Sequence, residues 1–286
     1  MKLHLENQRF CYVLVLFATS TLFSVLFLFL MPHPILNNIF PALFLFSFIF
    51  LLYTKKQHHH AKIKAQKDLE NTVEILSRLL YSKDQTTVRH TQRVREYAEI
   101  IAKYAGASKE EIKEIGMAAK LHDLGKIFVK EDVLRKRSSL TQEEYEHMKT
   151  HVKLDQVVEP LLKANLPIAK ILDVARLHHE RFDGKGYPLG LKGEAIPFAS
   201  RVIAVADAWD AMTSWRVYRN AMPEEKALEI LKSGSGSQWD PKIVEAFTKA
   251  YEAGEIKKVK ENHRMWIVKK QKQTLEKFES LLVMGA

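Results

Sequence analysis

The hydrophobic positions of this chain follow two different patterns. Residues 10–53 contain no Asp, Glu, Lys or Arg and hold two apolar segments, 10–31 and 35–53, each long enough to cross a bilayer as a helix. From Ala61 onward, apolar residues recur every three or four positions among polar ones, which is the period of amphipathic helices. The pattern predicts an all-α protein with a transmembrane helical hairpin (10–53), a helical cytoplasmic linker (54–69), an all-helical domain (70–255) and a basic helical tail (256–286).

Charged residues give the predicted hairpin an orientation. Lys2 and Arg9 precede the first apolar segment and Lys55 and Lys56 follow the second, whereas the short loop between them has neither Lys nor Arg. Because positive charges stay on the cytoplasmic side, we expect a cell-membrane protein with two spans whose N-terminus and large domain face the cytoplasm. A cleaved signal peptide fits less well, since it has a shorter apolar core and no second span.

Composition narrows the classes of function. The formal net charge is +10, and the excess of lysine is concentrated beside the hairpin and in the tail. Such lysines contact anionic lipid headgroups or water. No aromatic residues alternate with them, so the chain is not expected to bind a nucleic-acid polymer. The lone cysteine, Cys11, excludes a disulfide framework and a thiolate metal site.

Local signals mark individual helices. Residues 61–82 are predicted to form a helix that leaves the membrane and couples the hairpin to the domain. One face of the next helix consists of His90, Val94, Tyr97 and Ile101. Capping residues predict three further helix starts, at Thr141 with Glu144, at Asn165 with Pro167, and at Asp240 with Pro241. The first of these helices is expected to carry His151 and Val152, the second to carry His178 and Phe182, and residues 198–214 to form a helix bearing Asp207.

Histidine and aspartate recur at core-facing positions of these helices. A single buried histidine is usually satisfied by a hydrogen bond, but several unpartnered ones would cost about 1–3 kcal/mol each. A shared metal centre would satisfy them together. Asp123 has two carboxylate oxygens and is the natural bridge between two ions. Because sulfur ligands are missing, the set favours iron, manganese or a similar divalent ion over structural zinc. Its members are His90, His122, Asp123, His151, His178, His179 and Asp207.

The surroundings of these residues suit phosphoester chemistry. Two metal ions roughly 3.5–4 Å apart can clamp a phosphoryl group, and cations are expected around the scissile phosphate. Lys126 follows Asp123 by one helical turn, and Arg216 and Arg219 follow Asp207 with a spacing that places them on one face. The alternative for each of these side chains is an ordinary solvated charge.

Several motifs then occur together and in order. They are Asp84-Gln85-Thr86-Thr87-Val88-Arg89-His90, His122-Asp123-Leu124-Gly125-Lys126, His151, His178-His179-Glu180-Arg181-Phe182-Asp183-Gly184-Lys185-Gly186-Tyr187-Pro188, Asp207-Ala208-Trp209-Asp210-Ala211-Met212-Thr213 and Gly236-Ser237-Gln238-Trp239-Asp240-Pro241. Over about residues 70–255 the chain resembles the HD-GYP subgroup of the HD phosphohydrolase superfamily. The resemblance implies an all-helical, metal-dependent phosphodiesterase domain that converts the bacterial second messenger cyclic di-GMP to linear pGpG, GMP or both, and the predicted hairpin would anchor it to the membrane.

The resemblance also implies roles for individual residues. The seven histidines and aspartates named above carry the family's metal-ligand positions. Asp123 and Lys126 are the expected catalytic pair, and Lys126, Arg216 and Arg219 match positions that contact substrate phosphate. The loop residues Asp183, Gly186, Tyr187 and Pro188 flank the site and are expected to contact substrate. Gly186, Tyr187 and Pro188 are also implicated in binding a partner, for example a diguanylate-cyclase-type protein.

Two positions depart from the family pattern. Members with a third metal commonly carry glutamate four residues before the first histidine, where this chain has Thr86; we therefore predict two ions, iron or manganese. Val217 stands where proline is usual, a change expected to affect only the local backbone. His147 lies on a compatible face but is expected to be an exposed bystander.

Two other functions stay open. The chain could hydrolyse another cyclic nucleotide or dinucleotide, because pocket shape rather than ligand identity sets base selectivity. It could also be a non-catalytic adaptor that binds nucleotide or protein through the Gly186-Tyr187-Pro188 loop. The hairpin is expected to anchor the protein among membrane lipids and is a candidate for a homodimer contact.

Overall fold

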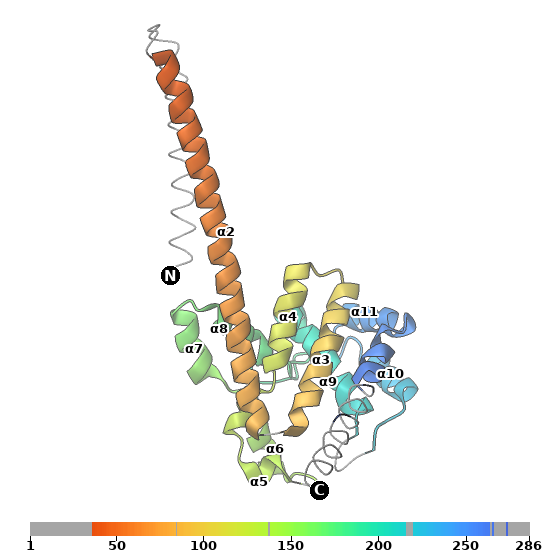
Figure 1. The fold of residues 1–286 in the computed structure, drawn as a ribbon. Coiled ribbons are helices and arrows are strands. Elements are labelled where there is room, and N and C mark those ends of the chain that lie inside the picture. The colour runs from red at the N-terminus through yellow and green to blue at the C-terminus, as the bar shows by residue number, and fades with distance from the viewer. Residues whose placement is uncertain are drawn as a thin grey trace, which may run out of the picture. The chain divides into compact units, whose positions relative to one another are not determined.

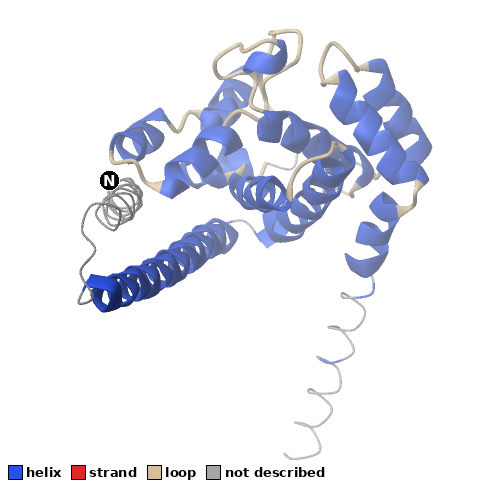
Figure 2. Cartoon of the chain, turned by 90° about the horizontal axis from the view of Figure 1, so that it is seen from above, coloured by secondary structure: helices blue, strands red, loops and turns tan. Residues whose placement is uncertain are grey.

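The computed structural model describes residues 36–83, 85–136, 138–215 and 220–263, together with the single residues 265 and 273. The chain divides into two compact units, Met1–Asn71 and Thr72–Ala286. In the described part all regular elements are helices, as Figure 2 shows. The predicted all-α class is therefore confirmed for these residues.

The first helix with described residues is α2 (Leu36–Lys83), which begins in the first unit and continues into the second. It includes the helix predicted for residues 61–82. Large apolar side chains between Leu43 and Tyr53 are mostly exposed, Phe46 to 70%. Among the described residues no helix has both the length and the apolar character needed to cross a bilayer. Residues 10–35 of the predicted hairpin lie outside the described residues.

The second unit is built around α3 (Gln85–Tyr104), which contacts α4 (Lys109–Leu121), α9 (Phe198–Thr213) and α11 (Pro241–Glu252). In Figure 1, α7 (Asp155–Lys163) and α8 (Pro167–Ala175) lie on one side of this centre, and α10 (Glu224–Ser233) and α11 lie on the other. Shorter elements complete the unit: the 3₁₀ helix η1 (Leu124–Phe128), α5 (Glu131–Leu134), α6 (Gln142–Lys149), η2 (Thr150–Val152) and η3 (Gly193–Ala195).

The core confirms the predicted face of α3. Val94, Tyr97 and Ile101 are fully buried, as their spacing of three and four positions requires. On the neighbouring elements, the rings of Trp209 and Phe247 pack with centroids 4.8 Å apart. Burying a side chain of this size stabilises the fold by on the order of 1.5–3 kcal/mol, so α3, α9 and α11 form a rigid support for the polar residues among them.

Two of the three predicted helix starts are confirmed. Thr141 forms a capping box with Glu144 at the start of α6, and Asp240 caps α11 with Pro241 at its first position. The predicted Asn165 cap is wrong: Leu166 is the N-cap of α8, and it makes no side-chain cap bond. Asn165 has φ of 52°, because asparagine tolerates the left-handed conformation that separates α7 from α8.

The predicted extent of two helices is also wrong. α6 ends at Lys149, and His151 lies in the 3₁₀ turn η2; the Thr150 hydroxyl donates to the His147 carbonyl at 2.7 Å. Likewise α8 ends at Ala175, so His178 and Phe182 are not on it. There the Ser200 hydroxyl donates to the Val174 carbonyl at 2.8 Å, which competes with continuation of the helix.

Candidate metal centre

The seven predicted metal-ligand residues come from five places in the fold and meet in one cluster. His90 lies on α3, His122 ends α4, and Asp123 directly precedes η1. His151 lies in η2, His178 and His179 lie in the turn after α8, and Asp207 lies on α9. Short distances join them, such as 3.2 Å from His90 Nε2 to Asp207 Oδ1 and 3.3 Å from His122 Nε2 to Asp123 Oδ2.

Three of the histidines are held by the same backbone contact. The Nδ1 atoms of His122, His151 and His178 each lie 2.7 Å from the carbonyl oxygen of the residue three positions earlier. Because a carbonyl only accepts, each Nδ1 carries the proton and each Nε2 keeps its lone pair. This is the tautomer in which histidine binds metal through Nε2.

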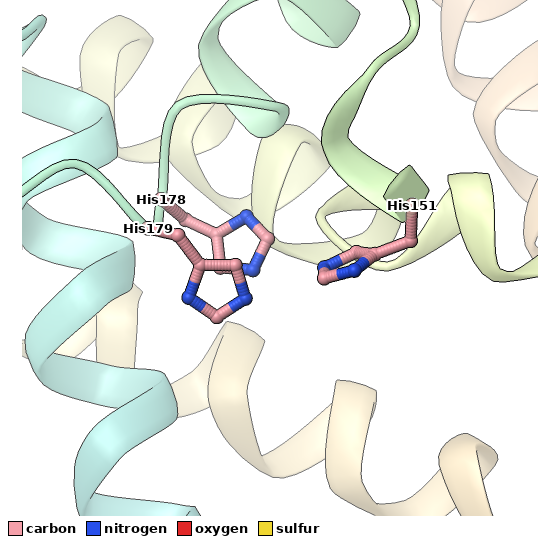
Figure 3. A group of neighbouring side chains, drawn as sticks. All are labelled: His151, His178 and His179. Atoms are coloured by element: carbon pink, nitrogen blue, oxygen red, sulfur yellow. The ribbon is translucent and has the colours of Figure 1, made fainter. Parts of the chain in front are cut away.

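Two of these lone pairs lack a hydrogen-bond partner in the part of the chain that the structure describes. The Nε2 atoms of His151 and His178 are buried and have no hydrogen-bond partner among the described residues. Figure 3 shows the neighbouring rings of His178 and His179 directed toward His151. Buried nitrogen atoms without partners are costly, and a bound cation would satisfy them. The residues therefore fit a metal ion.

The ligand atoms form overlapping groups. His90, His122 and Asp207 make a first group, and His151, His178 and His179 make a second; a third, His122, Asp123 and His178, overlaps both. In each group one ligand atom per residue lies within 4.8 Å of the others. Asp123 lies between the first and second groups, with Oδ2 3.3 Å from His122 Nε2 and Oδ1 3.7 Å from His151 Nε2. One carboxylate thus has an oxygen near a histidine of each group, and the bridging role of Asp123 stays a prediction.

Burial sets the charge state of the second group. It lowers the pKa of His151, places the pKa of His178 well below its usual value, and lowers the pKa of His179 to about 4. These rings are neutral near pH 7, the form that binds metal. Burial raises the pKa of Asp123, but the Lys126 ammonium beside it outweighs burial and holds that pKa well below its usual value. The carboxylate is therefore charged.

His90 differs from the other histidines. Its Nδ1 lies 2.8 Å from Asp210 Oδ2 rather than against a backbone carbonyl. Burial lowers the pKa of His90, but hydrogen bonds with Asp207 and Asp210 outweigh this and raise it to about 9. Sequence reasoning did not single out Asp210. The available signal was its position three residues after Asp207 on α9, which places both on one helix face.

Among the predicted substrate contacts, Lys126 and Tyr187 border the cluster. Lys126 Nζ lies 2.7 Å from Asp123 Oδ2. The Tyr187 ring stacks on His179 with centroids 4.8 Å apart. Gly186 permits this arrangement, because a Cβ there would lie 2.2 Å from the backbone nitrogen of Arg181.

The other predicted substrate contacts are not brought to the cluster by any described contact. Asp183 pairs with Arg181 at 2.7 Å and accepts the backbone N–H of Lys185, so it stabilises its own turn. Pro188 is half-buried and follows a cis peptide bond. Arg216 and Arg219, with Val217 between them, lie outside the described residues, as do the side-chain contacts of Thr86.

Glu180 and His147 lie near the cluster in the sequence, and both make hydrogen bonds to the backbone of neighbouring loops. Glu180 is 4% exposed, and its carboxylate accepts the backbone N–H groups of Leu189, Gly190 and Leu191 at 2.6, 3.1 and 2.9 Å. It fixes the loop after Tyr187, a role that sequence reasoning missed although Glu180 directly follows the paired histidines.

His147, predicted to be an exposed bystander, lies outside both groups; its ring is half-buried and accepts the N–H of Lys130.

Comparisons with known proteins agree with this site. The sequence profile of the HD domain family matches residues 74–243, more than half of the chain. A cyclic di-GMP phosphodiesterase of Thermotoga maritima is 43% identical over 182 residues, which cover 63% of this chain and 49% of the relative. A cyclic di-GMP phosphodiesterase of Vibrio cholerae is 36% identical over 65% of this chain and 40% of the relative. The 3'3'-cGAMP-specific phosphodiesterase 2 of the same organism is 34% identical over a region that covers 62% of this chain and 33% of the relative.

The chain belongs to the HD domain family, as a member of its HD-GYP group. It spans about half, or less, of the length of these curated relatives. The shared region contains all seven residues of the cluster.

Proposed function

We propose that this protein is a phosphodiesterase that hydrolyses cyclic di-GMP at a centre of two divalent metal ions, iron or manganese. The observation that carries the proposal is the position of Asp123, with one oxygen toward each of two ligand groups. A bridging carboxylate between two such groups is typical of two-metal phosphoester hydrolysis. The names of relatives up to 43% identical support cyclic di-GMP as the substrate.

Each ligand group would hold one ion. His90, His122 and Asp207 would hold the first ion together with Asp123 Oδ2. His151, His178 and His179 would hold the second together with Asp123 Oδ1. When bound, the two ions supply a water of lowered pKa and neutralise charge on the phosphoryl group.

The remaining residues of the site bind and orient the substrate. The Lys126 ammonium, fixed by Asp123 at 2.7 Å, reaches a phosphate oxygen and stabilises its charge. The Tyr187 ring, stacked on His179, forms the wall on the side of the second group. Deep burial of His122, Asp123, His151 and His178 excludes bulk water, which strengthens these electrostatic interactions.

Turnover by the purified full chain tests the proposal. After loading with Mn²⁺ or Fe²⁺, the wild-type protein is expected to convert cyclic di-GMP to pGpG, GMP or both, as resolved by chromatography. His122→Ala and Asp123→Ala should abolish turnover. His60→Ala removes an exposed histidine of α2 and should leave it intact. A wild-type chain that holds two ions and gives no product, or variants as active as wild type, would overturn the proposal.

3'3'-cGAMP is a second candidate substrate for the same assay. The relative specific for 3'3'-cGAMP is 34% identical over 62% of this chain, and the metal-ligand residues do not read the bases. The ratio of kcat/KM for cyclic di-GMP and 3'3'-cGAMP decides between the two substrates. The adaptor alternative predicts binding of either nucleotide, measured by calorimetry, without product.

We further propose that the protein acts at the cytoplasmic face of the cell membrane, anchored by a two-span hairpin and present as a homodimer. The charge pattern around residues 10–53 supports this, as do the exposed apolar side chains between Leu43 and Tyr53. The full chain is expected to stay in the membrane fraction after alkaline extraction. Its release into the supernatant, or a monomer in detergent by light scattering, would contradict the respective part of this proposal.

A further inference from the structure

The described contacts of Asp210 include no residue of the second ligand group, but they include His90 of the first. It is 1% exposed, and its Oδ2 lies 2.8 Å from His90 Nδ1. On the other side of the same ring, His90 Nε2 lies 3.2 Å from Asp207 Oδ1. The imidazole of His90 therefore lies between two carboxylates, which are one helical turn apart on α9.

Arg93 fixes the orientation of the Asp210 carboxylate. Its Nε donates to Oδ1 at 2.6 Å and its Nη2 donates to Oδ2 at 2.9 Å, a two-point contact. The Ser214 hydroxyl adds a third donor at 3.1 Å from Oδ1. His90 and Arg93 on α3 thus face Asp207 and Asp210 on α9, and the members of each pair are three positions apart.

The position of His90 explains why it needs a carboxylate. His122, His151 and His178 follow the ends of α4, α6 and α8, where carbonyl groups of the last turn lack helical partners and can accept from Nδ1. His90 lies inside α3, where the neighbouring carbonyl groups accept helical N–H groups. Its Nδ1 proton must find an acceptor on another element, and Asp210 provides it.

We propose that Asp210 is the positioning residue of the first ion site: by accepting the Nδ1 proton of His90 it directs the Nε2 lone pair toward the ion held with His122 and Asp207. This inference rests on the metal centre of the proposed function. It assigns Asp210 an effect on one ion of the two, since its described contacts do not include His151, His178 or His179.

Metal titration of Asp210→Asn tests the assignment. The full chain is stripped with a chelator and titrated with Mn²⁺, and bound metal is counted by calorimetry and elemental analysis. We expect two ions for wild type. For the variant we expect one ion of unchanged affinity and one weakened about 10–100-fold, the usual effect of losing an outer partner of a metal-bound histidine. The electron paramagnetic resonance spectrum should change from coupled to isolated Mn²⁺.

Asp240→Asn is the matched control. Asp240 is also a buried carboxylate, 3% exposed, and is paired with an arginine, Arg201, but none of its described contacts involves the cluster. This variant should bind both ions as wild type does. An equal loss of one ion in Asp240→Asn would overturn the proposal, because it would show a general effect of weakening the core.

Other results separate this inference from the proposed centre. If wild type and Asp210→Asn both bind two ions with equal affinity, Asp210 has no positioning role although the centre stands. If wild type binds fewer than two ions, the binuclear centre itself is wrong. If Asp210→Asn loses its helical circular dichroism, Arg93→Gln is measured instead. That variant keeps the carboxylate but removes two donors, and it should weaken the same single ion; unchanged affinity overturns the inference.

Discussion

At the scale of single residues, the Nδ1 contact decides how each histidine of the cluster behaves. Burial lowers the pKa values of His151 and His178 and leaves them neutral, and the carbonyl acceptor of each Nδ1 fixes the tautomer. The carboxylates of Asp207 and Asp210 instead raise the pKa of His90 to about 9. The metal-free site therefore contains both neutral imidazoles and one imidazolium. Loading the site must release the proton of His90 Nε2, because only the lone pair can bind an ion.

These pKa values predict how the stability of the metal-free chain depends on pH. His179 has a pKa of about 4 in the folded state, against about 6.5 in an unfolded chain. As pH falls from 6.5 to about 4, the unfolded state binds a proton that the folded state does not, so the free energy of unfolding decreases by about 1–3 kcal/mol. The pKa values of His151 and His178 are also lowered in the folded state, so these residues too decrease the free energy of unfolding as pH falls. His90 acts at higher pH, where its stabilisation is lost as pH rises from 6.5 through about 9.

Urea unfolding in the presence of a chelator measures this profile. The midpoint for wild type should be lower at pH 5 than at pH 7. His179→Gln removes the group with the depressed pKa and should show a smaller difference between the two pH values. A wild-type midpoint that is the same at pH 5 and pH 7 would contradict the burial of neutral histidines.

At the scale of elements, the close approach of η1 and η2 depends on Gly125. A Cβ on Gly125 would lie 1.7 Å from the carbonyl oxygen of His151 and 2.6 Å from its carbonyl carbon. Backbone atoms cannot turn aside as a side chain can, so Gly125→Ala must push η2 away and carry His151 from Asp123. We expect a loss of about 1–3 kcal/mol in stability and of the ion held by the second group.

Thermal unfolding and metal counting on the full chain check this prediction. Gly116→Ala is the matched control, because the three atoms nearest to its Cβ all belong to the flexible Glu99 side chain and none to backbone, and alanine favours the helix. That variant should keep both ions and near wild-type stability. If Gly125→Ala keeps both ions, the spacing of η1 and η2 does not govern the site.

The loop after Tyr187 depends on Glu180 in a similar way. Its carboxylate accepts three backbone N–H groups from residues 189 to 191. Glu180→Gln replaces one oxygen by an amide donor that faces those N–H groups. We expect a local cost of about 1–3 kcal/mol and faster amide hydrogen exchange at Leu189, Gly190 and Leu191. Glu194→Gln, at an exposed pair with Lys242, should not change exchange there; protection retained in Glu180→Gln would contradict the role of Glu180.

Helix positions and the inward residues could be read from the sequence because their signals are local. The spacing of Val94, Tyr97 and Ile101 places these residues in the core, and Thr141 with Glu144 caps α6. The end of α8 could not be predicted, because one donor to the Val174 carbonyl is Ser200, 26 residues away. Asp210 and His90 are 120 positions apart. Contacts of this kind leave no period in the sequence.

At the scale of the whole second unit, the cluster joins segments that are far apart in the chain. Its seven residues run from His90 on α3 to Asp207 on α9, and Asp123 lies between the two ligand groups. An ion that binds only the folded arrangement stabilises the fold by mass action, about 2.7 kcal/mol at a free concentration of 100 times its Kd. Metal loading is therefore expected to raise the Tm of the full chain.

The position of Asp123 between the two ligand groups predicts how much of this rise in Tm each of two variants keeps. Asp123→Asn leaves one oxygen and no charge between the groups, so both ions should bind more weakly. Added Mn²⁺ should then raise the Tm of this variant much less than it raises that of wild type. His179→Ala removes a ligand of the second group only, so about half of the rise should remain. Circular dichroism melts at increasing Mn²⁺ measure both effects against the chelated proteins. An Asp123→Asn protein that gains as much Tm as wild type would show that the two groups bind their ions without a shared carboxylate.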